Sequence, residues 1–240
     1  VPVRSVDGYL AKLIRAGRTV AICDQVQDPK DAKGIVKREL IRTVTPGTVL
    51  EPDLLEERAN NYLAAVCCAN GSAGLALIDV STGEFLAAQI DSDTERTLLN
   101  ELTRLNPAEV LVSSDTPDEF TATLKSKFEL TAFKRQPGHE FDPEHATSLL
   151  QRQFELGTLK GLDLETAKLA LGCAGAALNY VQETQRGAVP HLRLPRRYQP
   201  SGYVVLDSAT QRNLELVETL AGKRGKGSLL HVIDQTKTSM

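Results

Sequence analysis

The hydrophobic pattern at the start of the chain alternates between helical and extended spacing. Residues 5–16 predict an amphipathic helix that Ser5 can cap and that Gly17 ends. Residues 19–23 predict a buried strand, and a polar loop follows it. The apolar residues expected on one face of the helix are Val6, Tyr9, Leu10 and Leu13.

A second strand and a turn follow. Residues 39–44 alternate polar and apolar side chains, which is typical of a half-buried strand. Thr45-Pro46-Gly47-Thr48 predicts a turn in which Pro46 fixes φ and Gly47 permits a positive φ. With the preceding helix and strand, these elements describe the back half of a small α/β domain.

Beyond residue 60 the pattern changes to longer apolar runs. Three runs are separated by turn residues, so they predict an antiparallel meander. Helical and extended segments then alternate, which predicts parallel strand pairing. The expected meander strands are residues 62–67, 74–79 and 84–88. The expected helices are residues 94–105 and 117–127, and the strands that follow them are residues 110–112 and 130–133.

Helices dominate the next region. Residues 141–156 predict one helix, and residues 164–184 predict a second that Asp163 caps. The second helix is rich in alanine and glycine, which allows a neighbouring element to approach closely. Residues 187–200 contain several prolines and predict irregular structure. The whole pattern predicts a multidomain α/β protein.

The composition is that of a globular protein, with 240 residues, 41% hydrophobic residues and 25% charged residues. No apolar run approaches the length of a membrane helix and no signal segment opens the chain, so we expect a cytoplasmic protein without a membrane partner. The chain begins at Val1 and its one Met is the last residue, which suggests a fragment of a longer reading frame.

The net charge of −3 is spread unevenly. Residues 1–52 carry nine Lys/Arg and six Asp/Glu, a net charge of +3. Residues 53–160 carry nine and 18, a net charge of −9, and residues 161–240 carry ten and seven, a net charge of +3. Three segments with different partners are expected, and the acidic middle segment is not expected to lie on DNA.

Four cations lie on or beside the strand predicted at residues 39–44, which has Glu39 as its one acid. A basic strand beside a glycine-containing turn can hold a phosphate backbone, so we assign these cations to DNA-backbone binding. The competing interpretation is a solvated edge strand whose charges prevent aggregation. The four cations are Lys33, Lys37, Arg38 and Arg42.

The sequence lacks motifs for catalysis and nucleotide binding. No Gly-x-x-x-x-Gly-Lys-Ser/Thr is present, and the Gly- and Lys-rich residues 222–227 lack its spacing. Asp79 could begin a two-metal nuclease site, but Glu84 and Glu109 lie outside the expected core strands. The favoured role of Asp79 is to cap the turn at residues 81–83. We expect no catalytic residue, metal site, nucleotide site or cofactor in this chain.

The four cysteines form no CxxC pair, and the histidines are scattered. Cys67 and Cys68 are adjacent on a predicted strand and point to opposite faces, which makes them poor disulfide partners for each other. We interpret the cysteines as buried, reduced thiols.

Several long stretches resemble the bacterial MutS family. Residues 5–48 resemble its mismatch-recognition domain, and residues 105–109 resemble a helix-to-strand junction of its connector domain. Residues 206–216 resemble the opening of its core, or lever, domain, and residues 228–240 are similar to the segment that follows that opening. The runs most specific to the recognition domain are Val20 to Val26, Asp28-Pro29 and Arg42 to Thr48.

The resemblance implies a division into domains. Residues 1–52 correspond to the C-terminal part of the mixed α/β recognition domain (domain I), and residues 53–60 to a linker. Residues 61–186 correspond to the RNase H-like connector domain (domain II). Residues 187–240 correspond to the mainly helical start of the core or lever domain (domain III).

The resemblance also implies a function. Members of the family bind mispaired or looped duplex DNA, stack an aromatic wedge from a Phe-x-Glu motif on the mispaired base, and form homodimers. They couple binding of ATP and Mg²⁺ to recruitment of a MutL-like protein through the connector, at the nucleoid in the bacterial cytoplasm. The wedge motif and the ATPase domain are absent from this sequence, so we expect a non-enzymatic part of a mismatch sensor.

Two alternatives remain open. The first is an RNase H-like nuclease or resolvase, which would cleave branched DNA or RNA–DNA hybrids with a divalent metal. The second is a MutS paralogue that does not repair mismatches. Such paralogues lack the recognition domain, so the resemblance of residues 5–48 argues against the second.

Overall fold

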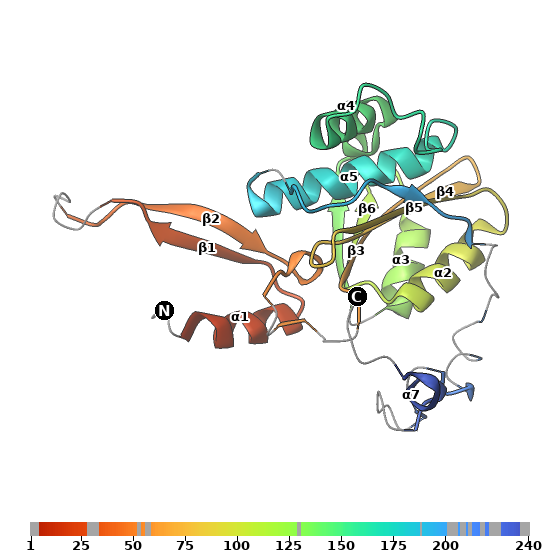
Figure 1. Ribbon diagram of the computed structural model, residues 1–240, viewed down its shortest axis with the longest axis horizontal. Helices are drawn as coiled ribbons and strands as arrows, with labels where there is room; N and C mark the ends of the chain where they lie inside the picture. Colours follow the sequence, from red (N-terminus) through yellow and green to blue (C-terminus); the bar gives the residue numbers. More distant parts are fainter. Residues whose placement is uncertain are drawn as a thin grey trace.

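The protein has a mixed α/β fold, as the sequence predicts, with a body built on one sheet and an arm that projects from it (Figure 1). We define the arm as α1, β1 and β2. The computed structural model describes residues 5–27, 34–51, 54–55, 59–128, 131–187, 189–200, 206, 210, 213–216, 219–220 and 227–235.

The body sheet contains six strands in the order β7-β6-β3-β4-β5-β8. The first three in sequence, β3, β4 and β5, form an antiparallel meander, which confirms the sequence prediction. β6 pairs in parallel with β3 and with β7, so the predicted parallel pairing is also confirmed. The strands are β3 (Tyr62–Ala69), β4 (Ser72–Asp79), β5 (Glu84–Ile90), β6 (Glu109–Ser113), β7 (Ala132–Gln136) and β8 (Arg196–Arg197).

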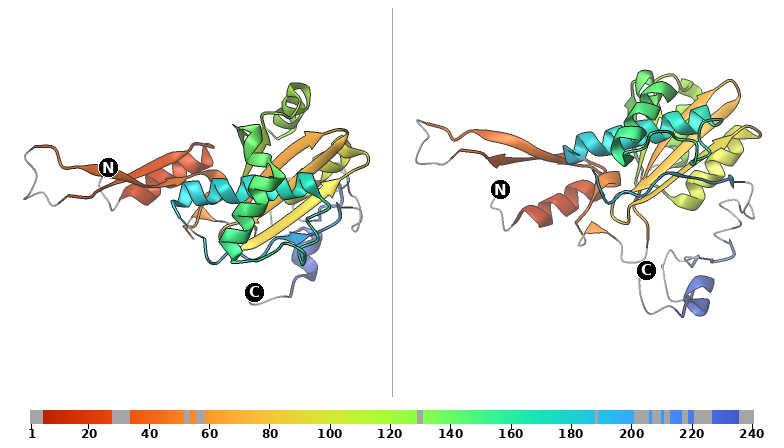
Figure 2. Two further views of the ribbon diagram at one scale, coloured as in Figure 1. Left: turned by 90° about the horizontal axis from the view of Figure 1, so that it is seen from above. Right: turned by 45° about the horizontal axis from the view of Figure 1, so that its top comes forward.

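Helices cover both faces of this sheet, with α4 and α5 on one face and α2 and α3 on the other (Figures 1 and 2). Leu63 and Phe85 belong to the core under α5, whereas Leu75 and Leu98 belong to the core beside α2. A strand covered on both faces is apolar at successive positions rather than at alternate ones. The helices are α2 (Thr94–Leu105), α3 (Asp118–Lys127), α4 (Pro143–Phe154) and α5 (Lys168–Gln185).

The two helices expected after residue 140 form with different boundaries. A 3₁₀ helix, η5 (Gly138–Phe141), precedes α4, because Pro143 occupies the first turn of α4 and Asp142 caps it by accepting a hydrogen bond from the Glu144 amide. α5 has Ala167 at its N-cap, and the expected cap, Asp163, is wrong because turns separate it from the helix.

The small residues of α5 permit close packing, as expected. A Cβ atom on Gly172 would lie 2.1 Å from the carbonyl oxygen of Phe141, and one on Gly175 would lie 2.4 Å from the Cβ of Ala146. Larger residues at these two positions would separate α5 from η5 and α4.

The arm has a small core of its own. α1 (Val6–Arg15) packs on an antiparallel pair, β1 (Val20–Gln25) and β2 (Arg38–Val44). Gly17 ends α1 with a φ of +69°, and Arg18 N–H donates to the carbonyl of Leu13, as a glycine stop requires. The buried residues of this hydrophobic cluster, from the arm and the segment that follows it, are Leu10, Ile14, Val44 and Val49.

Two predictions about burial in the arm are wrong. Tyr9 and Leu13 were expected inside, but they are 57% and 44% exposed, and Ile14 is buried instead. β1 was expected to be buried, but Ala21 and Cys23 are exposed. Both differences have one cause, because within the described residues the two-stranded sheet is covered by α1 on one face only.

The C-terminal region departs from the expectation of irregular structure at one point. Arg196 and Arg197 form β8, which pairs in parallel with Leu86 and Ala87 of β5 and so extends the sheet. A short helix, α7 (Leu229–Ile233), follows. Half of the predicted linker at 53–60, residues 207–209 and 211–212 of the segment 206–216, and residues 222–226 of the loop at 222–227 lie outside the described residues. Among the helices that are described, none is long and apolar enough to cross a membrane.

Candidate nucleic-acid interface

The arm carries three of the four cations predicted to bind DNA, and the fourth, Lys33, lies outside the described residues. Lys37 directly precedes β2, Arg38 begins it, and Arg42 lies near its centre. Figure 1 shows the β1–β2 hairpin extending away from the body, so these side chains are carried on an element that a long duplex can reach.

A bulge in β2 divides the cations between the two faces of the hairpin. Ile22 of β1 pairs with Arg42, but the next residue of β1 pairs with Leu40, so Ile41 is an extra residue. Side chains alternate between the faces of a strand, and an extra residue reverses the alternation. Arg42 therefore shares the face of Ile22, which packs on the core of the arm, and Arg38 lies on the opposite face.

Two of these cations already have carboxylate partners. The Lys37 Nζ lies 2.6 Å from Glu39 Oε1, and this hydrogen bond raises the pKa of Lys37 and lowers the pKa of Glu39. The Arg42 guanidinium pairs with Glu51. Arg38 is exposed and has no ion pair with any other described residue. The assignment of the four cations to the DNA backbone stays a prediction, and Arg38 has the least compensated charge of the three described.

The turn at the base of the hairpin is buried. Pro46–Thr48 form a 3₁₀ helix, η3, and Thr45 caps it with its hydroxyl 2.8 Å from that of Thr48. The predicted turn is confirmed, but the expected reason for its glycine is wrong, because Gly47 does not have a positive φ. A Cβ at Gly47 would lie 2.8 Å from the Cβ of Glu109. The glycine is needed for close approach to the body.

The Glu109 carboxylate is the centre of this junction. Glu109 is 2% exposed, and its Oε2 accepts hydrogen bonds from the Thr45 hydroxyl (2.5 Å) and from the Gly47 amide (3.0 Å). Its Oε1 accepts one from the Tyr180 hydroxyl at 2.7 Å. Burial and the charge of Glu109 raise the pKa of Tyr180, which keeps this hydroxyl protonated as a donor. Three donors thus compensate one buried charge.

Further contacts join the base of the arm to α5 and β3. Gln185 Nε2 donates to the carbonyl oxygen of Thr48 at 3.0 Å, and the Arg186 guanidinium donates to the carbonyl oxygen of Leu40. Asn61 Nδ2 donates to the carbonyl oxygen of Pro46 at 2.9 Å. The arm is therefore fixed to the body by polar contacts with the C-terminal end of α5 and the start of β3.

The carboxylates considered for a nuclease site have structural contacts. Asp79 Oδ1 accepts hydrogen bonds from the Ser81 amide (2.9 Å) and hydroxyl (2.6 Å), which confirms its role as a turn cap. Glu84 Oε2 accepts one from the Tyr62 hydroxyl at 2.6 Å. Glu84 and Glu109 were expected outside the core strands, and this is wrong, because Glu84 begins β5 and Glu109 begins the fully buried strand β6. Among the described residues, no group of three or more His, Cys, Asp or Glu could hold a metal ion.

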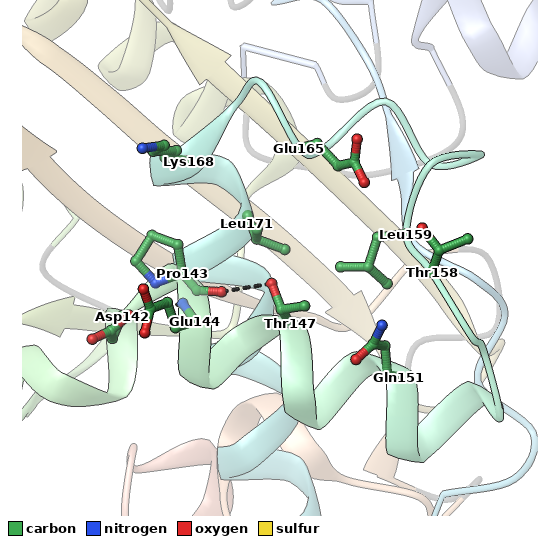
Figure 3. Close-up of a pocket in the computed structure, with 10 residues that line it drawn as sticks. All are labelled: Asp142, Pro143, Glu144, Thr147, Gln151, Thr158, Leu159, Glu165, Lys168 and Leu171. Carbon is green, nitrogen blue, oxygen red and sulfur yellow. Dashed lines mark hydrogen bonds between the residues drawn. The ribbon is translucent and has the colours of Figure 1, made fainter.

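A pocket of about 480 Å³ lies elsewhere, between α4 and the segment that leads into α5 (Figure 3). Thr147 and Leu171 form part of its wall, and Glu144, Glu165 and Lys168 lie around it. The excess of carboxylates disfavours a phosphate ligand. None of the predicted DNA-binding cations lines it.

The fold and its junction define a mixed α/β protein in which a small basic hairpin domain is fixed to a larger sheet domain. Residues 1–53 match the family model of MutS domain I, and residues 61–193 match that of MutS domain II. The chain therefore belongs to the MutS family.

Curated relatives match along the whole chain. The chain is 43% identical over 241 aligned residues to the DNA mismatch repair protein MutS of Symbiobacterium thermophilum. It is 38% identical to the proteins of the same name from Lachnoclostridium phytofermentans and Halothermothrix orenii. The alignments cover 100% of this chain but only 26–28% of each relative. The chain thus spans about a quarter of the length of these proteins.

Sequence reasoning found the basic strand but missed its anchor. Glu109 and Gln185 lie 62 and 137 residues from their partners in the turn, and Tyr180 lies 71 residues from Glu109, so no local pattern joins them. One signal was available for Glu109, because it is a single acid at the start of the apolar run Val110-Leu111-Val112. A charge in that position needs buried donors.

Proposed function

We propose that this chain is the part of a DNA mismatch-repair sensor that joins the mismatch-recognition domain to the connector domain. The observation that carries the proposal is the identity of 38–43% along the whole chain with proteins named DNA mismatch repair protein MutS. The arm contributes phosphate contacts to a duplex, and the junction at Glu109 fixes the direction in which the arm leaves the body.

The body acts as the connector. Its strand order, with a meander of three antiparallel strands followed by two parallel strands, supports an RNase H-like domain. The acidic charge of residues 53–160 repels phosphate, so this domain binds a MutL-like protein rather than DNA. We use the word parent for the full-length mismatch-repair protein of which this chain forms a part. ATP and Mg²⁺ act in other parts of the parent, and the parent is a cytoplasmic homodimer.

A duplex titration tests the role of the arm. Binding of the chain to a fluorescent homoduplex and to the same duplex with one mismatch is measured by anisotropy over a series of salt concentrations. We expect weak binding that falls as salt rises, because Lys and Arg release counterions from the phosphates. Both duplexes should bind alike, because no aromatic wedge motif is present to stack on a mispaired base.

The substitution Arg38→Gln, compared with a control substitution, tests whether the basic strand contacts the DNA phosphates. Loss of one phosphate contact reduces the slope of log affinity against log salt by roughly 0.9. The matched control is Lys125→Gln, which removes an exposed cation at the end of α3 in the body. Equal changes of this slope in the two variants would instead favour the interpretation of the basic strand as a solvated edge strand. A mismatch preference would place the recognition residues within this chain.

The partner is tested separately. The chain is immobilised and its association with a MutL homologue is measured beside the full-length parent. Association of both supports the assignment to the body. Association of the parent alone would place the contact outside this chain.

A further inference from the structure

Two cysteines from distant parts of the chain meet under α5. Cys67 lies on β3 and Cys173 lies on α5, and the Cys173 thiol donates a hydrogen bond to the Cys67 sulfur with the two Sγ atoms 3.3 Å apart. Cys173 is fully buried, whereas Cys67 is 7% exposed. The pair therefore combines sulfur–sulfur contact with partial access to solvent at one sulfur.

The approach of α5 to the sheet brings the two sulfurs together. Gly74 is the cross-strand partner of Cys67, and a Cβ at Gly74 would lie 2.3 Å from the carbonyl oxygen of Leu169. The glycine thus allows the first turn of α5 to lie directly on β4. Cys173 follows Leu169 by one helical turn, so the same close approach sets it against Cys67.

We propose that Cys67 and Cys173 form a reversible intramolecular disulfide when the protein meets hydrogen peroxide. The Cys67 thiolate attacks one peroxide oxygen and the O–O bond breaks, which gives a sulfenic acid at Cys67. The leaving hydroxide takes the proton that the Cys67 thiol released and becomes water. The Cys173 sulfur then attacks the sulfenic sulfur. The S–O bond breaks, the leaving hydroxide takes the Cys173 proton as water, and the S–S bond forms. Two thiols are oxidised and one peroxide is reduced to two waters.

The surroundings favour Cys67 as the first sulfur to react. The hydrogen bond from Cys173 lowers the pKa of the Cys67 thiol, and burial raises the pKa of the Cys173 thiol. The neighbouring Cys68 packs on the opposite core, and burial raises its pKa to about 12. Cys23 is exposed on the arm, so it can react with other molecules.

The disulfide would tie the first half of α5 to β3. The same helix holds the base of the arm at its other end through Tyr180 and Gln185. The bond would close a loop of more than 100 residues, which restricts the unfolded chain strongly. Oxidation should therefore stabilise the body and the helix on which the arm is anchored.

The experiment uses the 240-residue chain with Cys23→Ser, which removes cross-links between molecules. The reduced protein is treated with hydrogen peroxide, free thiols are alkylated, and peptides are analysed by mass spectrometry before and after dithiothreitol. The same treatment is applied to Cys68→Ser and to Cys67→Ser in that background. Melting temperature is measured for each oxidised and reduced form.

We expect a cross-linked peptide pair that is lighter by two hydrogen atoms and that dithiothreitol separates. Cys68→Ser should keep the cross-link and the oxidised form should melt about 5 °C higher than the reduced form. Cys67→Ser should lose both. A cross-link that survives Cys67→Ser, a cross-link that Cys68→Ser removes, or oxidation of Cys67 to sulfinic acid without cross-linking would each overturn the proposal.

Discussion

The arm and the body bury their strands in different ways. In the body, helices cover both faces of the sheet, and Leu63 and Leu75 are completely buried. In the arm, two strands have one helix, and Tyr9, Leu13 and Ile41 remain exposed. The body is thus stabilised by two large cores, whereas the described arm has one small core and depends more on its attachment to the body.

The attachment of the arm to the body is polar, whereas the cores of the body are apolar. One buried carboxylate, Glu109, accepts hydrogen bonds from the turn at the base of the arm and from α5 of the body. Removal of a buried acceptor leaves its donors unpaired, which costs more than the bonds contribute while intact. Polar junctions of this kind define one geometry, because a displaced carboxylate loses several partners at once.

Glu109→Ala should have the largest effect on stability. The change leaves the Tyr180 and Thr45 hydroxyls and the Gly47 amide without their acceptor, and should lower the free energy of unfolding by about 4 kcal/mol. Urea unfolding measures it. Glu84→Ala is the control, because water can replace that partly exposed carboxylate, and should cost about 1 kcal/mol. Equal costs would show that Glu109 is not the anchor.

Hydrogen exchange should separate the arm from the body directly. Amides of β1 should exchange on the order of 100-fold faster than amides of β3 and β4, because local opening of the arm exposes little apolar surface. Mass spectrometry of the intact chain after timed labelling measures the ratio. Equal protection of the two regions would mean that they open as one unit.

Gly47→Ala tests the close approach at the junction. The new Cβ would lie 2.8 Å from the Glu109 Cβ and 3.0 Å from Leu63 Cδ1, so we expect a loss of about 2 kcal/mol in urea unfolding. Gly157→Ala is the matched control, because no atom lies within 4 Å of its Cβ position. A loss no greater than that of the control would show that η3 can move away from β6 without cost.

The smallest expected effect is in the body, at Glu140. Burial, and then the charge of Glu183, raise the pKa of Glu140 above its ordinary value of 4.5. Its protonated form is favoured in the folded state, so this contribution to stability is present at low pH and is lost as pH rises through the raised value. Glu140→Gln should reduce the decrease in the free energy of unfolding between low and neutral pH. The reduction should be less than about 1 kcal/mol, because the side chain is partly exposed.

Stability measured from pH 4 to pH 7 checks this prediction. Glu144→Gln, at an exposed position in the first turn of α4, is the control. An unchanged profile in Glu140→Gln would assign the pH dependence to other groups.

Local patterns in the sequence determined most secondary structure. The helix at residues 94–105 has the predicted boundaries, and the meander and the parallel strands pair as expected. These signals are local, because helix period, turn residues and glycine stops act within a few neighbouring residues. The basic strand was also visible, since charge composition needs no tertiary information.

Burial and the junction were decided by tertiary structure. Apolar spacing in α1 favoured Leu13 as a core residue, but Ile14 faces the two-stranded sheet. Tertiary structure also brings together Glu109 and Tyr180, which are 71 residues apart in the sequence, and Cys67 and Cys173, which are 106 residues apart. A sequence pattern states which side chains need partners, but chain topology decides which partners arrive. Long-range contacts depend on how helices dock on a sheet, and no local periodicity contains that information.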